Sequence, residues 1–457
     1  MARHDLQKYM HPGCRAHLVG IGGVSMSPLA EVLRGAGLTV TGSDMQDSTA
    51  VAHLRSIGIP VTIGHRPENI SGADCVIRTA AARDDNPEIA AARQVGIPVF
   101  ERAQAWGIIM QQYRNALCIS GTHGKTTTTS MCTHILMAAQ SDPTVMIGGT
   151  IPLLGAGHRV GRGDTIVLES CEYCDSFLSF FPTVAVILNV DADHLDYFSD
   201  LAAVKRSFRA FASLVPENGC VVANCEDTNT MDALTGLDRP MLTFGLEHGD
   251  IKAEHMSWIN GMAEFDVTAY GTFYAHVALQ VPGLHNVKNA LAAAAAAYVM
   301  HLPGPAVEQG LSSFSGAGRR FEHKGTFRGA EVYDDYAHHP SELEALLTTA
   351  KKLGYSRILC AFQPHTYTRT KELFDEFVRV LQLPDRVLLA EIYAAREQNT
   401  IGISSRALVP YIPHSCYYAT LEELTSALSQ MAQPGDLILT VGAGNIYTAG
   451  EALLKNN

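Results

Sequence analysis

The clearest chemical pattern in the chain is the segment from Gly121 to Thr127, Gly-Thr-His-Gly-Lys-Thr-Thr. A strand is expected to end at Ser120 and a helix to begin near Lys125, so the segment forms a turn in front of a helix N-terminus. Backbone N–H groups in such a turn bind phosphate groups. The Lys125 ammonium can reach the outer phosphates of a nucleotide, and the Thr126 hydroxyl can ligate Mg²⁺. We therefore predict a phosphate loop made of Gly121, Thr122, His123, Gly124, Lys125, Thr126 and Thr127.

This loop departs from the general phosphate-loop pattern in its spacing. Only two residues separate Gly121 from Gly124, whereas the general pattern has four between its glycines. The alternative is an ordinary turn that carries a lysine by chance. The Gly-Lys-Thr ending and the strand–turn–helix context together favour phosphate binding.

A second glycine-rich turn, from Gly20 to Ser25, follows the first expected strand. It is similar to the dinucleotide-binding pattern, with Asp44 at the end of the next strand. Ser25 stands where that pattern has its third glycine, so the match is incomplete. We predict that the turn binds a diphosphate group; a tight turn without a ligand is the alternative.

Acidic residues and a histidine follow two further apolar strands. Glu169 and Glu172 come after one strand, and Asp193 and His194 come after another. Because the carboxyl ends of parallel strands meet at one edge of a sheet, these side chains should face the phosphate loop. Mg²⁺ prefers hard oxygen ligands. We expect Glu172 to ligate one Mg²⁺ that also touches Thr126, with His194 at a second metal position; surface or capping roles are the alternatives.

The last part of the chain holds further polar candidates. Asn289 can read an adenine edge through its amide, whereas neighbouring Asn286 can cap the helix that starts there. The adjacent arginines Arg319 and Arg320 can clamp phosphates when domains close, or form an interdomain salt bridge.

Two histidine-containing segments close the set of candidates. The segment His338-His339-Pro340 opens a helix, and a metal role for the histidine pair is disfavoured because no third ligand is evident. The segment from Gln363 to Thr370 stands at the carboxyl end of a strand, where doubly wound sheets bind ligands. Cys171 and Cys174 have a zinc or redox spacing, but no second Cys pair completes such a site.

Short β-branched runs alternate with Ala/Leu-rich helical stretches along the chain, which is typical of α/β proteins. We predict three domains. A Rossmann-like domain covers residues 1–112, a central α/β domain of the phosphate-loop ATPase type covers 113–316, and a second Rossmann-like domain covers 317–457.

Composition narrows the classes of function. The chain has 457 residues and a formal net charge of -12, which disfavours general binding to nucleic acid or anionic membranes. Its ten cysteines are scattered, mostly in apolar runs, as in proteins of a reducing cytosol. The first residues lack the apolar stretch of a secretory signal, and no run reaches the ~20 apolar residues of a membrane span. We therefore expect a cytoplasmic protein.

Seven segments carry a resemblance to a known family: GTHGKTT, EYCDSFL, NVDADH, GLHNVKN, GRRFE, YDDYAHHPSE and FQPHTYTRT. With the opening HLVGIGGVSMSPLAEVL, they run in order from about position 17 to about position 370. The chain resembles the Mur ligases of peptidoglycan synthesis. The resemblance implies an ATP-dependent amide ligase that uses Mg²⁺, joins L-alanine to UDP-N-acetylmuramate and passes through an acyl phosphate.

The resemblance also implies roles for individual residues. Lys125 and Thr126 belong to the phosphate loop, Glu172 and His194 match magnesium positions, and Asn289 matches an adenine contact. The remaining implied contacts are Arg320 for phosphate, Asp335 for ribose, His338, His365 and Arg369 for the amino acid and acyl phosphate, and Gly22, Gly23, Ser43, Asp44 and Thr79 for the UDP sugar.

The resemblance leaves two assignments open. The segment from Glu169 to Tyr173 departs from the usual family pattern, so either Glu169 or Glu172 can be the metal ligand. Lys205 stands where several relatives carry a carbamylated lysine, but an ordinary helix lysine is the favoured interpretation.

Three alternative functions differ from alanine ligation. A related ligase attaches a recycled murein tripeptide to the same sugar nucleotide, but the segment QPHTYTRT favours alanine. A nicotinamide-dependent dehydrogenase would use the N-terminal turn, and Ser25 argues against it. An ATP-binding regulator without ligase turnover is disfavoured because Lys125, Glu172, His194 and Arg320 are all present.

Overall fold

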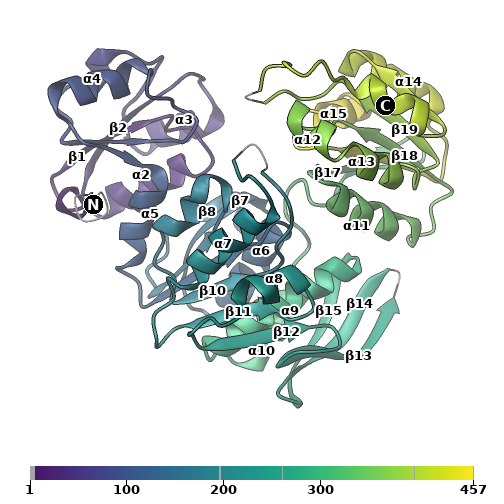
Figure 1. Cartoon of the computed structure of the whole chain (residues 1–457), viewed down its shortest axis with the longest axis horizontal. Helices are drawn as coiled ribbons and strands as arrows, with labels where there is room; N and C mark the ends of the chain where they lie inside the picture. Colours follow the sequence, from purple (N-terminus) through teal and green to yellow (C-terminus); the bar gives the residue numbers. More distant parts are fainter. Residues whose placement is uncertain (1–5, 195–196, 260, 396, 456–457) are drawn as a thin grey trace.

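The computed structural model describes residues 6–194, 197–259, 261–395 and 397–455. These residues form three α/β lobes in chain order, each built on its own sheet (Figure 1). The first lobe lies at the upper left of Figure 1, the central lobe below, and the last lobe at the upper right. The expected α/β class with three domains is confirmed.

Among the described residues, the first lobe has a five-stranded parallel sheet in the order β3-β2-β1-β4-β5. Leu18, Ile77 and Val40 are buried on its strands, as expected for a sheet covered by helices. Its elements are η1 (Gln7–Tyr9), β1 (Arg15–Val19), α2 (Met26–Gly35), β2 (Thr39–Asp44), α3 (Thr49–Ser56), β3 (Val61–Ile63), η2 (Pro67–Ile70), β4 (Cys75–Arg78), α4 (Pro87–Val95), β5 (Val99–Glu101) and α5 (Arg102–Met110).

The central lobe has a ten-stranded sheet within the described chain, ordered β15-β14-β13-β12-β11-β10-β6-β9-β7-β8. Its middle is parallel, so β6, β9 and β10 deliver their carboxyl ends to one edge. Its strands are β6 (Asn115–Ser120), β7 (Thr144–Ile151), β8 (Ala156–Arg159), β9 (Thr165–Glu169), β10 (Val184–Ile187), β11 (Cys220–Asn224), β12 (Met241–Gly245), β13 (Ile251–Ile259), β14 (Met262–Ala269) and β15 (Thr272–Pro282). Its helices are α6 (Lys125–Ala138), η3 (Tyr173–Ser179), α7 (Leu201–Ala212), α8 (Thr228–Leu234), α9 (Leu284–Val299) and α10 (Gly304–Ser312).

Helix α9 carries an alanine-rich segment in the core of the central lobe. Its alanines from Ala292 to Ala296 are almost fully buried. Helix α9 packs against α6 and against strands of the sheet, and small alanine side chains allow this close approach.

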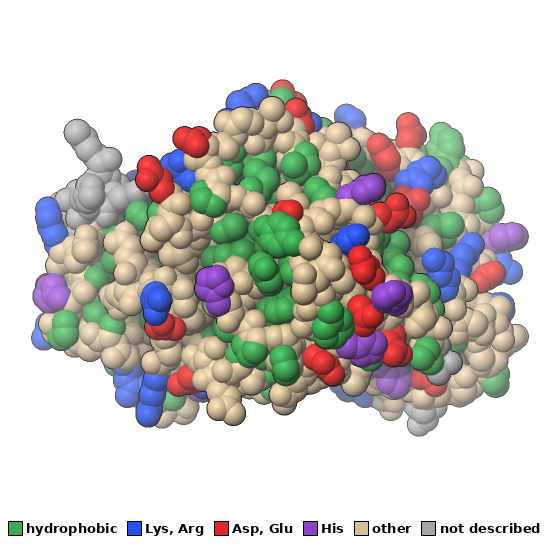
Figure 2. Space-filling model, turned by 90° about the horizontal axis from the view of Figure 1, so that it is seen from below, with side chains coloured by type: hydrophobic (Ala, Val, Ile, Leu, Met, Phe, Trp, Pro, Cys, Tyr) green, Lys and Arg blue, Asp and Glu red, His purple; other side chains and the backbone are tan. Residues whose placement is uncertain are grey.

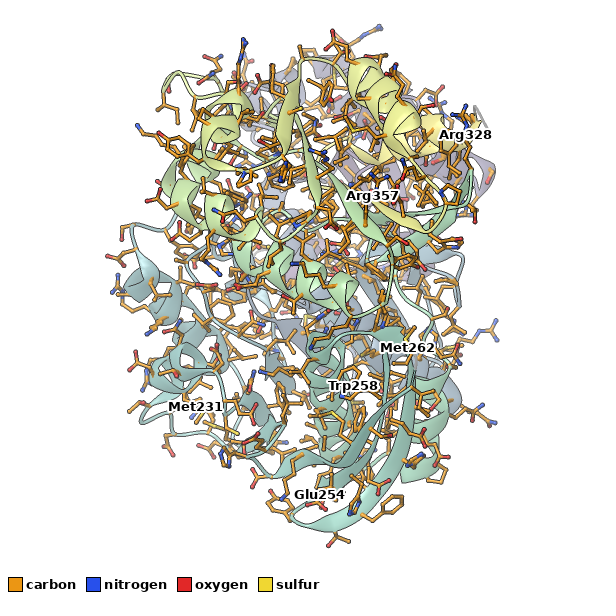
Figure 3. All side chains as sticks on the ribbon, turned by 90° about the vertical axis from the view of Figure 1, so that its right-hand side faces the viewer. Met231, Glu254, Trp258, Met262, Arg328 and Arg357 are labelled. Atoms are coloured by element: carbon orange, nitrogen blue, oxygen red, sulfur yellow. The ribbon has the colours of Figure 1, made fainter. Side chains whose placement is uncertain are left out.

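The antiparallel strands β13, β14 and β15 were not anticipated from the sequence. They extend the sheet beyond β12 as a meander at the bottom of Figure 1. The outer part of β13 is exposed, and Trp258 on it is 45% exposed (Figure 3). The other tryptophan, Trp106 of α5, is 1% exposed and donates its indole N–H to the Ser25 carbonyl oxygen at 3.2 Å.

The last lobe has a six-stranded sheet within the described residues, ordered β16-β17-β21-β18-β19-β20. It is parallel except for β16, which pairs antiparallel with β17 and was not expected. Two short helices, divided at Leu373, follow β18. The elements are β16 (Glu322–Phe327), β17 (Ala330–Asp335), α11 (Pro340–Lys351), β18 (Arg357–Phe362), α12 (Tyr367–Glu372), α13 (Phe374–Val380), β19 (Arg386–Ala390), η4 (Ser405–Tyr411), β20 (Ser415–Tyr418), α14 (Leu421–Met431), β21 (Asp436–Val441) and α15 (Tyr447–Lys455).

The surface and the helix lengths agree with the composition. None of the described helices combines the length and the apolar character that a membrane-crossing helix needs. On the face seen in Figure 2, the described Lys and Arg side chains lie among Asp and Glu rather than in a broad basic band. All ten cysteines lie within the described residues and are free thiols.

Candidate active site

The phosphate loop lies between β6, which ends at Ser120, and α6, which begins at Lys125, as predicted. Its two glycines have positive φ, 143° at Gly121 and 85° at Gly124. A Cβ on Gly124 would lie 2.6 Å from Oδ1 of Asn289, so this position has no room for a side chain. Despite the short spacing between its glycines, the segment therefore forms a turn whose backbone lies directly before the N-terminus of α6.

Lys125 is held against the loop by three acceptors. Its Nζ donates to the carbonyl oxygen of Gly121 at 2.5 Å, to that of Thr122 at 3.0 Å and to Oε2 of Glu172 at 3.0 Å. Burial disfavours the ammonium, but the Glu172 carboxylate outweighs burial and holds the pKa of Lys125 above its usual range. Lys125 therefore carries a fixed positive charge at the loop.

The two carboxylates expected at the metal site, Glu169 and Glu172, have different partners at the loop. Thr126 donates its hydroxyl to Oε1 of Glu169 at 3.0 Å, whereas Glu172 pairs with Lys125. The other carboxylate oxygen of Glu169 accepts the N–H of Gly148 at 2.6 Å. Both carboxylates thus lie at the loop, one beside the threonine hydroxyl and one beside the lysine. This set of oxygen atoms fits the ligands that Mg²⁺ prefers.

His194 and Asp193 follow β10 and face the last lobe. Asp193 Oδ1 accepts hydrogen bonds from Nη2 of Arg369 at 2.6 Å and from Nε at 3.2 Å. Burial opposes ionisation of Asp193, but Arg369 holds the pKa of this carboxyl below its usual range. His194 has a φ of 54° and packs beside Tyr173. Burial lowers the pKa of His194, so its ring is available as a neutral ligand.

Two histidines of the last lobe lie next to this ion pair. The ring of His338 lies 5.6 Å from that of His365, and Nδ1 of His365 lies 3.2 Å from Nη1 of Arg369. His338 donates Nδ1–H to the Tyr336 carbonyl oxygen at 3.0 Å. Burial lowers the pKa of His338 to about 4, so the ring is neutral at physiological pH. The structure therefore gathers His338, His365 and Arg369 as one group.

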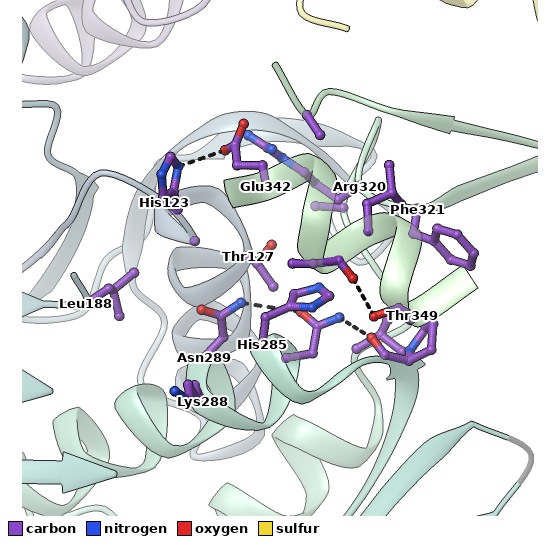
Figure 4. Close-up of a pocket in the computed structure, with 18 of the residues that line it drawn as sticks. His123, Thr127, Leu188, His285, Lys288, Asn289, Arg320, Phe321, Glu342 and Thr349 are labelled. Atoms are coloured by element: carbon purple, nitrogen blue, oxygen red, sulfur yellow. Dashed lines mark hydrogen bonds and ion pairs between the residues drawn. The ribbon is translucent and has the colours of Figure 1, made fainter. Parts of the chain in front are cut away.

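A cavity of about 260 Å³ lies between the central and last lobes. It is lined by the loop residues His123, Gly124 and Thr127 and by Asn289 of α9, together with Arg320 and Asp335 (Figure 4). A second cavity of about 1130 Å³ contains Thr126, Glu169 and Arg320. Arg320 borders both cavities, and its guanidinium lies 5.1 Å from the Tyr336 ring centre.

Asp335 and Asn289 are held rigidly at this cavity. Asp335 accepts the N–H groups of Phe321 and Ala337, each at 2.7 Å, and burial raises its pKa to about 6. Asn289 is 8% exposed and donates its amide to Oδ1 of Asn286 at 3.3 Å.

Two alternatives raised by the sequence are wrong. Gly283, not Asn286, is the N-cap of α9, and the Asn286 amide donates to the Pro282 carbonyl oxygen at 2.7 Å. Arg319 lines the larger cavity beside Arg320, but its guanidinium is engaged within the last lobe. It bonds to Asp334 at 2.8 Å and to backbone carbonyl oxygens of its own lobe, which leaves Arg320 as the phosphate candidate of the pair.

Gly22, Gly23, Ser43, Asp44 and Thr79 lie at the carboxyl edge of the first sheet. The turn is held by Asp44, whose Oδ2 accepts the N–H of Gly22 at 2.8 Å. The edge is where open α/β sheets bind ligands. The contact of these five residues with a UDP sugar stays a prediction.

Behind that edge lies a buried carboxylate. Glu88 is 0% exposed, and its Oε2 accepts the hydroxyl of Ser43 at 2.6 Å. His65 and His17 lie 3.3 Å and 3.6 Å from the same oxygen, and the Asn69 amide bonds to the other. Glu88 was not singled out in the sequence because its partners come from four separate segments.

Two further contacts across the lobes were missed. His123 leaves the loop to meet the start of α11, with Nδ1 3.2 Å from Oε1 of Glu342. Asp193 was noted only as a neighbour of His194, yet it pairs with Arg369. The Pro-Ser-Glu segment is typical of a helix start and could have singled out Glu342, but nothing local indicates its partner. Lys205 of α7 pairs with Asp232 at 2.8 Å.

Comparison with known proteins identifies the family. Three family models match in succession: "Mur ligase family, catalytic domain" over residues 15–114, "Mur ligase middle domain" over 119–297 and "Mur ligase, glutamate ligase domain" over 319–444. The chain belongs to the Mur ligase family. This Mur ligase is 44% identical to the UDP-N-acetylmuramate–L-alanine ligase of Caldanaerobacter subterraneus subsp. tengcongensis, covering 99% of both chains. It is 45% identical to that of Acetivibrio thermocellus, over 99% of this chain and 97% of the relative.

Solved structures agree with this placement. The UDP-N-acetylmuramate-alanine ligase of Thermotoga maritima superposes on this Mur ligase with a TM-score of 0.81 at 30% identity, over 97% of this chain and 98% of the other. A murein peptide ligase from Psychrobacter arcticus has a TM-score of 0.74 at 26% identity over the same shares.

Proposed function

We propose that this Mur ligase joins L-alanine to the lactyl carboxylate of UDP-N-acetylmuramate, with hydrolysis of ATP to ADP and phosphate. One observation carries the reaction class: the phosphate loop, two carboxylates and the Asp193–Arg369 pair meet where two lobes close on each other. The 44–45% identity to alanine ligases over nearly the whole chain supports the choice of substrates.

ATP would lie along the junction of the central and last lobes. The cavity that is lined by Asn289 and Asp335 has the size and polar groups for a nucleoside, and the loop residues His123, Gly124 and Thr127 also line it. Arg320 borders both cavities and so is placed to contact the phosphates between them.

Mg²⁺ fits the oxygen set at the loop. Thr126, Glu169 and Glu172 would hold it, with His194 as a candidate for a second position. When bound, Mg²⁺ would neutralise phosphate charge and orient the transferred group.

The side chains at the junction would each serve a different step of the reaction. The Lys125 ammonium would stabilise charge on the phosphoryl group as the lactyl carboxylate attacks it to form an acyl phosphate. The amine of alanine would then attack the acyl carbon and release phosphate. Closure of the lobes across Asp193 and Arg369 would exclude water from the acyl phosphate. Neutral His338 and its neighbour His365 would face the reacting groups.

The test mixes the purified full chain with ATP, Mg²⁺ and UDP-N-acetylmuramate, and adds L-alanine, glycine, L-serine or the murein tripeptide separately. Phosphate release and product mass are followed together. One alanine added per phosphate supports the proposal, and ligation of the tripeptide alone overturns the choice of substrate. No ligation by a chain that binds ATP overturns the ligase function. Lys125→Ala should abolish turnover, whereas the matched variant Lys252→Ala, on β13, should retain it.

A further inference from the structure

Three side chains from two lobes converge beside the phosphate loop. They are His123 of the loop, Asp191 after β10, and His339, the N-cap of α11. One potential ligand atom from each lies within 4.8 Å of the other two. Local sequence patterns do not join these residues, because Asp191 and His123 stand more than a hundred positions before His339.

His339 contributes one ring nitrogen to this cluster and carries an unsatisfied nitrogen on the same ring. The side chain is 5% exposed, and its Nδ1 lies 2.7 Å from the Ser341 hydroxyl. Its Nε2 is buried and has no hydrogen-bond partner among the described residues. A buried polar atom without a partner is costly and needs an explanation, such as an ion that binds there.

His123 has the orientation of a metal-binding histidine. Its Nδ1 lies 3.2 Å from a carboxylate oxygen of Glu342, and its Nε2 lies 3.8 Å from Oδ2 of Asp191. Histidines that bind metals commonly donate their second ring N–H to a carboxylate in this way, which leaves the other nitrogen free to ligate. Nε2 also lies 2.9 Å from the Ser341 hydroxyl, a bond that a metal ion would displace.

We propose that His123, Asp191 and His339 form a site for a divalent transition-metal ion of the Zn²⁺ or Co²⁺ kind, bridging the central and last lobes. Two imidazoles and one carboxylate are the ligand set that such ions take, with water at the fourth position. Mg²⁺ prefers oxygen ligands, so this site is distinct from the oxygen set of Thr126, Glu169 and Glu172.

The geometry requires only a small contraction. Tetrahedral zinc with bonds of about 2.0–2.1 Å places its ligand atoms about 3.3 Å apart. The cluster is now within 4.8 Å, so the ligand atoms must approach by up to about 1.5 Å. Rotation of the half-buried Asp191 carboxylate and a slight further closure of the lobes would supply this. The ion also replaces a proton, because Glu342 and Asp191 outweigh burial and raise the pKa of His123 to about 9.

The site has a consequence beyond the ligase reaction. A metal ion bound by residues of both lobes stabilises the closed arrangement. Release of products requires the lobes to part. Zn²⁺ should therefore slow turnover at concentrations that saturate this site, by holding the lobes together rather than by displacing Mg²⁺.

The experiment titrates Co²⁺ into the metal-free full chain with Mg²⁺ in excess and records visible absorption. Tetrahedral Co²⁺ with nitrogen ligands gives strong visible bands, unlike six-coordinate Co²⁺ at an oxygen site. We expect about one ion per chain with intense bands that Zn²⁺ abolishes by competition. His339→Gln and, separately, Asp191→Asn should weaken binding at least about tenfold.

His134→Gln is the matched control, because His134 is also 5% exposed with an unpartnered Nε2 and contacts Ser313 and Phe314, but belongs to no group of three potential metal ligands among the described residues. It should retain the bands. Absence of intense bands in the parent chain, or equal affinity in the parent and in a folded Asp191→Asn variant, overturns the site. Thermal melts identify any variant that fails to fold. If the His339 variant does not fold, the Asp191 variant alone decides the test. The readout does not depend on ligase activity, so failure of the proposed function leaves it interpretable.

Discussion

Replacing Asp193 by Asn should strongly reduce activity by weakening closure of the lobes. In the structure Asp193 accepts two hydrogen bonds from the Arg369 guanidinium, and the two side chains are 8% and 10% exposed. The pair crosses from the central to the last lobe, so it exists only when the lobes are together. Asn keeps one acceptor oxygen but removes the negative charge, which leaves the arginine buried without its counter-ion.

The size of the expected effect follows from the burial of the Asp193–Arg369 pair. Removing one partner of a buried ion pair costs about 3–5 kcal/mol, and the retained oxygen of Asn places this change near the lower end. In separated lobes both groups are hydrated, so the cost falls almost entirely on the closed arrangement. A cost of about 3 kcal/mol corresponds to roughly a 10²-fold shift against closure. Because closure precedes both chemical steps, kcat/KM for L-alanine should fall by a similar factor.

The assay measures kcat/KM by phosphate release for four chains: the parent, Asp193→Asn, Arg369→Ala and the double variant. If the two residues act as a pair, the double variant is little worse than either single one, because the second change removes nothing further. The control is Asp232→Asn, which breaks the exposed pair with Lys205 and should change kcat/KM less than threefold. Retention of kcat/KM within threefold by Asp193→Asn, or fully multiplicative losses in the double variant, would refute the reasoning.

Three further predictions follow from single residues. Lys125→Ala should lower the single-turnover rate of phosphate release about 10²–10³-fold, because the loop loses its fixed cation; an unchanged rate would contradict its role. Asn289→Ala should weaken ATP binding about tenfold by calorimetry, as expected for a lost hydrogen bond of about 1–1.5 kcal/mol, with a melt to confirm folding. Glu88→Gln should destabilise the first lobe in urea at neutral pH. Burial opposes its charge, but His17 and Ser43 lower the pKa of Glu88 from 4.5 to about 2, so its stabilisation is complete above pH 4.5 and is lost as the pH falls towards 2. The difference between parent and variant should shrink over that window, and a constant difference would contradict this.

The sequence was sufficient where function depends on consecutive residues. The turn from Gly121 to Gly124 lies between a strand and a helix that are adjacent in the chain, so this local context was predicted correctly. The same holds for the start of α11 at Pro340, which its turn residues mark. The order of the lobes followed from the alternation of strands and helices.

The sequence failed where partners depend on local turns. Glu169 and Glu172 are three residues apart, and which of them meets Thr126 is decided by the path of the chain after β9. That path includes Cys174 and Asp175 at positive φ, a conformation that their residue types do not predict. The strand β16 was missed for a different reason, since its segment Glu322–Phe327 is largely polar and lies at a sheet edge.

Contacts between the lobes could not be predicted from local patterns in the sequence. Asp193 and Arg369 are 176 residues apart, and His123 and Ser341 are 218 apart. Their pairing depends on how two separately folded sheets dock. No periodicity or motif within either segment records that docking.

The contrasting positions of the two tryptophans give this chain a built-in pair of optical reporters. Trp106 is sealed from solvent near the turn of the first lobe and should emit at short wavelength, shielded from iodide. Trp258 stands on the outer part of β13 and should emit at longer wavelength and be quenched readily. Iodide can therefore quench the emission of Trp258 and leave the emission of Trp106 in the first lobe visible. Ligand binding at the carboxyl edge of the first sheet, the proposed sugar-nucleotide site, then becomes measurable in the unlabelled protein, separately from events elsewhere in the chain.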